Sequence, residues 1–252
     1  MAVIRSIMIH DQIYMGLRRA IMCGHFKPGE QLSARGLATD FDTSQMPVRD
    51  ALNRLSSEKA VERTNDRRYR IAFLAETYIE NLYQARIINE GAATELAATL
   101  ISDSVLQQLV EIQDKIEGES EIALQLKDDA EAEVDVRNDI NLHNKFHFTI
   151  YKACENPVLI SIIESLWLQY APGISVYIEA FTATSTKAEL KRLNKINNQK
   201  HRKIISALRS KNAARAKTTM LLDITSKDKI IEASRIDHGK LLPERHITEY
   251  LL

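Results

Sequence analysis

The chain has 252 residues, of which 44% are hydrophobic and 27% charged, a composition typical of ordinary globular proteins. Its 8 glycines and 5 prolines are few, which argues against a loop-rich β architecture and favours long helices. The net charge is zero, but the first 75 residues hold 12 basic and 8 acidic side chains, against 22 and 26 in the remainder. A basic first third on an acidic body is compatible with nucleic-acid binding by the first third alone.

Two further features bear on where the protein works. Cys23 and Cys154 are far apart and form no CxxC pair, so a reducing compartment is expected rather than a disulfide framework. Charged residues interrupt the N-terminus, which therefore lacks a signal peptide's apolar core. No apolar run approaches the roughly 18–20 residues that a membrane helix needs. The sequence predicts a cytoplasmic protein with no membrane segment.

The first helix is predicted from a four-residue repeat of apolar side chains along one face, at Ile9, Ile13, Leu17 and Ile21. We expect it to end at Gly24, because glycine readily adopts the left-handed conformation that closes many helices. Pro28-Gly29 then supplies a turn.

Two short helices and a hairpin follow. Ser33 and Ser44 are placed to cap the helices, and Pro47 falls in the first turn of the second, where its missing N–H costs nothing. Two β-like runs, 61–64 and 69–73, flank a polar turn and predict a hairpin. Three helices and a hairpin in this order are typical of a winged helix-turn-helix, which we assign to residues 1–75.

From residue 76 onward the pattern is helical almost throughout. We predict helices at 76–100, 103–117, 119–154, 157–181, 187–210 and 212–234, the third with a break near 130. Pro157, Pro172-Gly173 and the Thr182–Thr186 cluster are the expected breakpoints. The fold class is therefore mainly α, with an antiparallel all-helical bundle over 76–234 and a C-terminal tail over 235–252.

The N-terminal domain resembles the DNA-binding domain of GntR-family repressors. The resemblance lies in Ala20-Ile21, Pro28-Gly29 with Leu32, Leu37-Ala38 and the string Pro47-Val48-Arg49-Asp50-Ala51-Leu52. The wing departs from the family pattern, which has a glycine where this chain has Asp66-Arg67-Arg68-Tyr69.

A recognition helix in such a domain presents its first turns to base edges in the major groove. Arg49 can form a bidentate contact with guanine, and Gln45 can pair with adenine. The arginines of the second helix and the hairpin suit phosphates or the minor groove. The candidate DNA-binding residues are Arg35, Ser44, Gln45, Met46, Arg49, Arg67 and Arg68. The alternative is that exposed arginines are merely solvated, or that the head binds protein.

Residues 76–225 resemble the FCD effector domain of the FadR-like subgroup of that family. The resemblance rests on Arg86 and Glu90, on Phe146-His147 with Asn156-Pro157, and on His201 before Ile204-Ile205. In many members an Asp and three His hold a divalent metal. The resemblance places these ligands at His143, His147, His201 and Asp223, with His143 where the family has Asp and Asp223 where it has His.

Three nitrogens and one oxygen suit Zn²⁺ or Ni²⁺. His143 and His147 are one helical turn apart and can face one ion, although such a pair is often only core or surface decoration. In a competing register Asp139 and His143 face inward and His147 lies off the stripe. The flanking Phe146 and Ile150 favour the register with His147 inward.

Arg86 corresponds to an arginine that binds the effector's carboxylate in the resembling domains, because its planar fork matches that group. The alternative is an intrahelical pair with Glu90. The resemblance thus implies a homodimeric, ligand-controlled regulator that binds a pseudo-palindromic operator and a small organic acid, not an enzyme. A metal-sensing repressor and a metal-dependent hydrolase built on the same four ligands are the competing interpretations.

Overall fold

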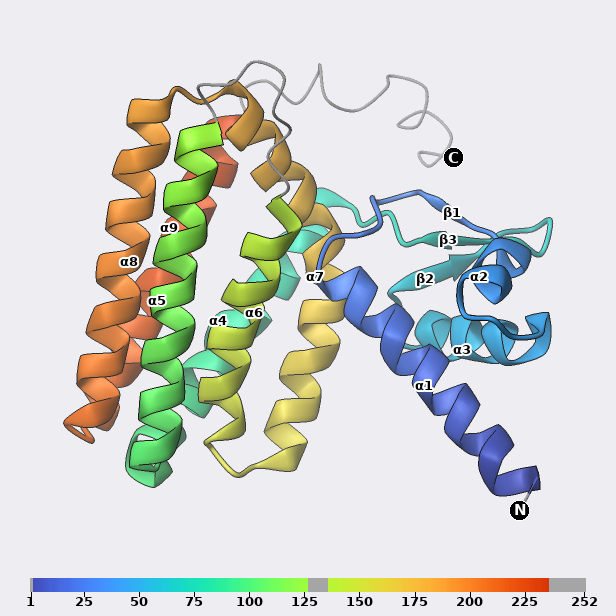
Figure 1. Ribbon diagram of the computed structural model, residues 1–252, viewed down its shortest axis with the longest axis horizontal. Helices are drawn as coiled ribbons and strands as arrows, with labels where there is room; N and C mark the ends of the chain where they lie inside the picture. The colour runs from blue at the N-terminus through green and yellow to red at the C-terminus, as the bar shows by residue number, and fades with distance from the viewer. Residues whose placement is uncertain (1, 127–135, 236–252) are drawn as a thin grey trace.

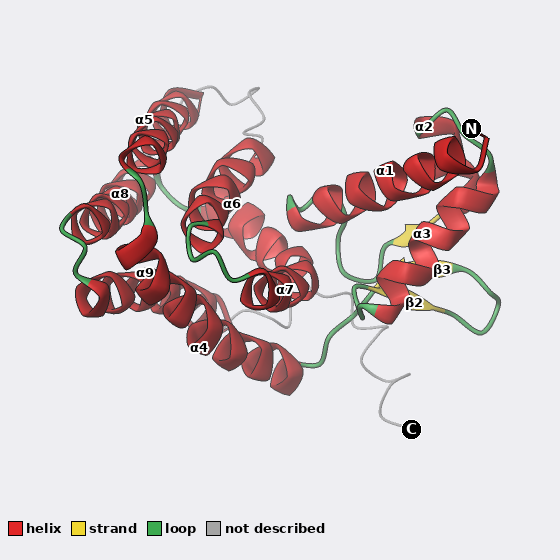
Figure 2. Ribbon diagram, turned by 90° about the horizontal axis from the view of Figure 1, so that it is seen from below, coloured by secondary structure: helices red, strands yellow, loops and turns green. Residues whose placement is uncertain are grey.

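The computed structural model describes residues 2–126 and 136–235; the predicted tail over 235–252 lies outside them except for its first residue. Within these residues the chain forms a head of three helices and three short strands, followed by six further helices (Figure 1). Seen from below, the head lies to one side of the helical part, with α1 reaching toward α7 (Figure 2). The predicted fold class, a winged helix-turn-helix joined to an antiparallel helical bundle, is confirmed.

The first helix, α1 (Ala2–Met22), ends as the sequence predicts. Gly24 has a φ of +75°. Its N–H donates to the carbonyl of Ile21, and the N–H of His25 donates to that of Ala20. This pair of hydrogen bonds is the Schellman arrangement, which satisfies carbonyls at the helix end and requires the left-handed residue.

The helix-turn-helix consists of α2 (Ala34–Asp40) and α3 (Gln45–Ser57). The Ser33 side chain accepts a hydrogen bond from the N–H of Gly36, so this predicted cap is confirmed. Ser44 precedes α3 in an extended conformation but makes no side-chain capping bond. Pro47 lies buried in the first turn of α3, as predicted.

The wing is a three-stranded antiparallel sheet in the order β1-β3-β2. The predicted hairpin is β2 (Val61–Arg63) and β3 (Tyr69–Ile71), with Val61 opposite Ile71. A further strand, β1 (Gln31–Leu32), pairs with β3 and was not among the predicted elements. Two residues after a Pro-Gly turn carry too short a pattern to be recognised as a strand.

The bundle comprises α4 (Glu76–Leu100), α5 (Asp103–Leu126), α6 (Val136–Lys152), α7 (Pro157–Thr184), α8 (Lys187–Arg209) and α9 (Ala213–Arg235). Its core is one cluster of buried side chains from all six helices, with Phe146, Ile150 and Tyr151 of α6 among the largest. A capping box of Thr186 and Glu189 starts α8. The head has its own core, built on Leu17, Ile21 and the apolar face of α3.

Two predicted breakpoints in the bundle are wrong, because Gly118 lies inside α5 and Pro172 lies inside α7. The breakpoint at Thr182–Thr186 is confirmed, since α7 ends at Thr184 and Thr186 caps α8. In a helix interior one glycine costs about 1 kcal/mol of helix stability, and one proline costs about 3 kcal/mol. Packing of α5 on α6 and α8, and of α7 on α1, α4 and α6, compensates for these costs along the whole helix. The predicted third helix, 119–154, is described only at its two ends, in α5 and α6.

The apolar character of α7 also exceeds the prediction. An 18-residue window in it reaches a mean hydropathy of 1.2, and no other described helix has the length and composition to cross a membrane. The helix packs against α1, α4 and α6, and 39% of this window is buried.

The head docks on the bundle through the end of α1. Arg18 Nη1 donates to Glu164 of α7 at 2.8 Å, and the Asn144 amide of α6 donates to the carbonyl of Met22 at 2.8 Å. Leu168 of α7 is fully buried within the core of the head. A β-carbon on Gly24 would lie only 2.6 Å from the Ser175 Cβ, so glycine is needed here for close approach as well as for its backbone.

Candidate functional site

The structure places all of the predicted DNA-contacting side chains at the surface of the head. The exposed set is Arg35, Ser44, Gln45, Met46, Arg49, Arg67 and Arg68. The helices α2 and α3 and the β2–β3 turn that carry them lie on the side of the molecule away from the bundle (Figure 1). This arrangement leaves the first turns of α3 and the wing open to a duplex.

Local contacts hold the wing and the recognition helix together. The Tyr69 hydroxyl of β3 donates to the Asn53 side chain of α3 at 2.8 Å. Arg68 pairs with Asp66 at 3.1 Å, and Arg67 occupies the left-handed region at a φ of +62°. Within the described residues neither Arg35 nor Arg49 forms an ion pair, so both guanidinium groups remain available for phosphates or bases.

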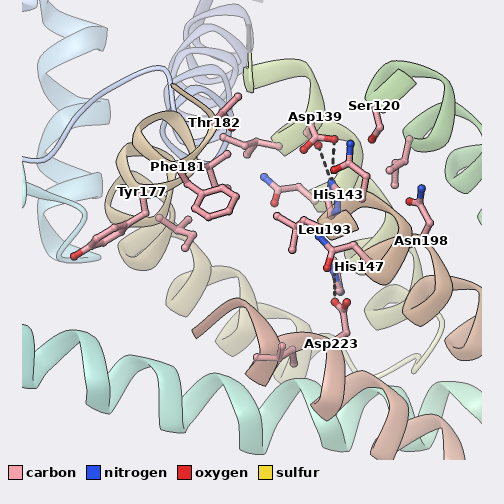
Figure 3. Close-up of a pocket in the computed structure, with 18 of the residues that line it drawn as sticks. Ser120, Asp139, His143, His147, Tyr177, Phe181, Thr182, Leu193, Asn198 and Asp223 are labelled. Carbon is pink, nitrogen blue, oxygen red and sulfur yellow. Dashed lines mark hydrogen bonds and ion pairs between the residues drawn. The ribbon is translucent and has the colours of Figure 1, made fainter. Parts of the chain in front are cut away.

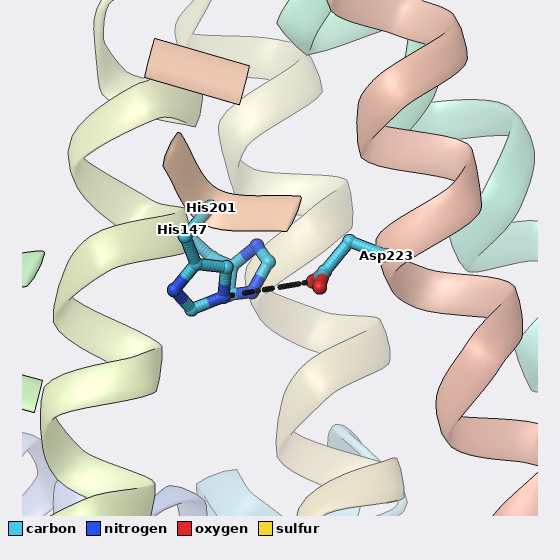
Figure 4. A group of neighbouring side chains, drawn as sticks. All are labelled: His147, His201 and Asp223. Carbon is cyan, nitrogen blue, oxygen red and sulfur yellow. Dashed lines mark ion pairs between the residues drawn. The ribbon is translucent and has the colours of Figure 1, made fainter. Parts of the chain in front are cut away.

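A second group of functional side chains is buried in the bundle. His147 of α6, His201 of α8 and Asp223 of α9 converge there, each at most 1% exposed. Their ligand atoms all lie within 4.8 Å of one another (Figure 4). Asp223 Oδ2 is 3.3 Å from His147 Nε2 and 3.8 Å from His201 Nε2. Three helices that are distant in sequence thus point two imidazoles at one carboxylate.

The hydrogen bonds of Gln113 assign the proton on His201. The Gln113 amide nitrogen donates to Glu117 at 3.0 Å and to Asn198 at 3.1 Å. Its oxygen is therefore the atom that faces His201 Nδ1, at 2.6 Å. An amide oxygen only accepts, so Nδ1 of His201 carries a proton, and Nε2 is the ring nitrogen that faces Asp223. Phe146 stacks on this imidazole at a centroid distance of 4.2 Å, which fixes the plane of the ring.

Nδ1 of His147 carries a proton as well. The Tyr151 hydroxyl donates to Glu90, and His147 Nδ1 lies 3.2 Å from that hydroxyl oxygen. Burial and the neighbouring Glu90 raise the pKa of Tyr151 well above its ordinary value, so the phenol stays protonated. Its single proton is committed to Glu90, and His147 Nδ1 must donate to the oxygen.

These side chains fit a divalent cation. With both Nδ1 atoms used as donors, the Nε2 atoms of His147 and His201 and the carboxylate of Asp223 are the three donor atoms that could coordinate one ion. Nitrogen and oxygen donors of this kind suit Zn²⁺ or Ni²⁺. Gln113 and Tyr151 supply the outer hydrogen bonds that usually orient metal-binding histidines.

His143, predicted as the first ligand, lies outside the group of three. Its Nδ1 is 3.1 Å from the carbonyl of Asp139 and 3.5 Å from that residue's carboxylate, because it points along its own helix. Its ring centroid is nevertheless 5.0 Å from that of His201. The structure therefore brings together three of the four predicted ligands and leaves His143 beside them.

Arg86 is buried and paired as the simpler interpretation predicted. Its Nε donates to Glu90 Oε1 at 2.6 Å, and the guanidinium carbon lies 4.1 Å from the Trp167 ring centroid and 4.2 Å from that of Tyr170. Burial, the largest single influence, lowers the pKa of Arg86, but the charge and hydrogen bond of Glu90 together with Tyr170 and Tyr151 outweigh it, and the net shift is upward. Glu90 also accepts from Trp167 and Tyr151, so one network links Arg86 to His147.

A cavity of about 160 Å³ opens beside these groups. Arg86, His143, His147 and Asp223 are among the residues that line it. Figure 3 shows Tyr177 and Phe181 of α7 on another side of it from His147 and Asp223. A void of this size accommodates a molecule about as large as benzene. We call His147, His201 and Asp223 the histidine–aspartate group. A small ligand in the cavity can therefore contact Arg86 and this group at the same time.

Sequence reasoning missed the residues that orient the histidines. Gln113 interrupts the apolar stripe formed by Leu109, Ile112 and Ile116 of α5, and a buried amide at a core position was the available signal. Tyr151 lies one turn after His147 on the same face, which was a second signal.

A winged head on a helical bundle that encloses a ligand-sized cavity is the architecture of a DNA-binding transcriptional regulator. The FCD domain family matches residues 81–225, and the family described as bacterial regulatory proteins, gntR family, matches residues 9–71. The chain belongs to the GntR family of transcriptional regulators and carries an FCD domain.

Known regulators are similar over most of the chain. The HTH-type transcriptional regulator McbR of Escherichia coli is 25% identical over 179 residues, which cover 71% of this chain and 76% of McbR. The Uxu operon regulator of Haemophilus influenzae is 25% identical over 234 residues, covering 88% and 81%. The solved structure of E. coli McbR/YncC shares the fold, with a TM-score of 0.77 at 22% identity over 90% of this chain and 98% of that one.

Proposed function

We propose that this regulator is a cytoplasmic homodimer that binds a pseudo-palindromic operator and is controlled by a small carboxylate bound in the FCD domain. The observation that carries the proposal is the buried group of His147, His201 and Asp223 beside a cavity that Arg86 also lines. The division into a DNA-binding domain at 1–75 and an effector domain at 76–234 is part of it. Because the cavity has room for an organic molecule, an organic effector is favoured over a metal ion alone as the signal.

The effector site would combine a cation with a guanidinium. His147, His201 and Asp223 would hold Zn²⁺ or Ni²⁺, with His143 as the nearest further donor. The bound ion would supply a positive charge for one carboxylate oxygen of the effector. The Nε and one terminal nitrogen of Arg86 donate to Glu90. Its remaining N–H groups can donate to the second carboxylate oxygen of the effector.

The link from the cavity to the head would run through α7. Ile174, Ile178 and Phe181 line the cavity, whereas Ser175 meets Gly24 and Glu179 pairs with Lys27 at 3.1 Å. One helical segment thus has the ligand on one face and the head on the other. Pro172 precedes it and cannot make the usual helix hydrogen bond, which makes that turn the easiest place to bend. Ligand binding would shift this segment and with it α1.

Specific DNA binding should depend on Arg49. The DNA is a duplex selected from a random library with the wild-type protein. For this duplex Arg49→Ala is expected to lose about 1–3 kcal/mol of binding free energy. The base preference at one base pair should also relax, since Arg49 would contact a guanine edge. Arg68→Ala, the matched wing variant, is expected to weaken binding to all DNA sequences alike. It should also reduce the slope of log affinity against log salt concentration by about one. Salt titrations by fluorescence anisotropy measure both effects. Wild-type binding by both variants would place the DNA contacts elsewhere.

Assembly gives a separate expectation. One winged domain reads a single half-site, so useful affinity requires two heads about one helical turn of DNA apart. Sedimentation should therefore find a dimer at micromolar concentration, and the selected sites should contain inverted half-sites. A monomer both in free solution and on DNA would contradict the proposed assembly.

A further inference from the structure

The side chains of α7 and α8 that line the cavity become more apolar with distance from His201. On α8, Asn197 and Asn198 lie about one turn from His201, whereas Leu190 and Leu193 lie two to three turns before it, with Asn194 beside Leu193. On α7, Trp167 and Tyr170 cover Arg86, whereas the lining beyond Pro172 is largely aliphatic and aromatic. Since α7 and α8 are joined by a short connection at 185–186, their apolar segments come together near that connection.

The apolar end is not part of either hydrophobic core. Its side chains are only half-buried, and none belongs to the core cluster of the head or to that of the bundle; they are Ile174, Ile178, Phe181, Leu190 and Leu193. Figure 3 shows Phe181 and Tyr177 on one side of the pocket and Asp223 on another. Apolar surface that faces a cavity rather than a core becomes favourable when an apolar ligand covers it.

We propose that the effector is an amphipathic acid, a carboxylate on an alkyl or aromatic body, and not a polyhydroxylated acid such as a sugar acid. This inference rests on the proposed function, which places the carboxylate at Arg86 and the histidine–aspartate group. Leu193 precedes His201 by eight residues, a rise of about 12 Å, so the apolar body points from His201 toward the α7–α8 connection. A ligand of this shape covers Leu193 and Ile178 while its carboxylate stays beside Arg86.

Hydroxyl groups on the ligand would find few partners along this wall. A polar group buried without a hydrogen bond costs about as much as a lost bond, and the side chains of Ile178, Phe181 and Leu193 offer neither donors nor acceptors. Polar side chains also line the cavity, but Asn198 already accepts from Gln113 and Asp139 already pairs with His143; the others are Ser120, Thr182, Asn194 and Asn197. A hydroxyl group that lies against Ile178, Phe181 or Leu193 therefore loses its hydrogen bonds to water without replacement.

The test compares acids of equal carbon number on the full-length protein loaded with Zn²⁺. By isothermal titration calorimetry we expect hexanoate to bind at least tenfold more tightly than gluconate, its hydroxylated counterpart. From butyrate through hexanoate to octanoate the affinity should rise by up to about fourfold per methylene, until the cavity is filled. Tighter binding of gluconate than of hexanoate would overturn the inference and leave the proposed function standing. Failure of every acid to bind would instead refute the proposed effector site.

Variants of α8 test where the apolar body of the ligand lies. Leu193→Asn should weaken the binding of hexanoate by roughly tenfold and leave the binding of butyrate nearly unchanged, since only the longer chain reaches this side chain. Ile196→Asn is the matched control, because Ile196 lies on the same helix, is 39% exposed and does not line the cavity. It should bind both acids like the wild type. Equal losses of both acids in Leu193→Asn, with its melting temperature preserved, would contradict the assignment of the apolar end.

Discussion

Asp223→Asn is expected to abolish tight binding of the divalent ion and to leave a protein whose thermal stability no longer responds to a chelator. Asp223 is the only carboxylate in the buried group and lies within ion-pair distance of both imidazoles. Its loss should lower metal affinity by more than the 10–100-fold typical of losing an outer partner. The wild type should lose about 2–3 kcal/mol of stability on chelation if the free ion had been at about 100 times its dissociation constant.

The matched control is Asp139→Asn. Asp139 lines the same cavity, but its carboxylate pairs with His143 and its side chain is 41% exposed. This variant should retain its metal content by elemental analysis and its response to chelator. His143→Ala should fall between the two, because His143 lies outside the group of three yet close to His201. A wild-type protein that carries no metal after expression in supplemented medium, and melts identically with and without chelator, would refute the metal site.

Most of the head could be predicted from the sequence because its signals are local. The glycine that ends α1 and the serine that caps α2 each act through backbone groups within a few residues, so their chemistry is visible in the sequence itself. The breaks predicted at Gly118 and Pro172 failed for the opposite reason. Their outcome depends on packing against helices far away in the chain, which overrides local preference.

The candidate site divides in the same way. His147, His201 and Asp223 could be named together only through a resemblance, since the first and the last are 76 positions apart and no local pattern joins them. Their burial and mutual approach come from the structure. The orientation of His143 could not be predicted from the sequence. It lies one helical turn before His147, but its Nδ1 faces the carbonyl of Asp139. Whether it faces the shared centre depends on how α6 is rotated against α8.

Gly24→Ala is expected to destabilise the protein more than Gly29→Ala and to separate DNA binding from its control by the effector. Both glycines have nearly the same backbone conformation, with φ of +75° and +77°, so an alanine at either should cost about 1–2 kcal/mol in backbone strain. At Gly29 an added Cβ meets no atom within 4 Å, whereas at Gly24 it would overlap Ser175 of α7. The excess, about 1–3 kcal/mol from overpacking, therefore measures the contact between the head and the bundle. Chemical denaturation of the two variants gives both values.

The functional consequence follows from the position of Ser175. It lies between the cavity-lining Ile174 and Ile178 on α7, so a head pushed away from this segment should respond less when a ligand moves it. Gly24→Ala should keep operator affinity, because its recognition helix is unchanged, but its operator affinity should change less than that of the wild type when hexanoate is added. Adding Ser175→Gly removes the overlapping Cβ and should restore part of both stability and control, a non-additive result expected of residues in contact. Gly24→Ala and Gly29→Ala variants with the same stability and the same effector response would show that control reaches the head by another route.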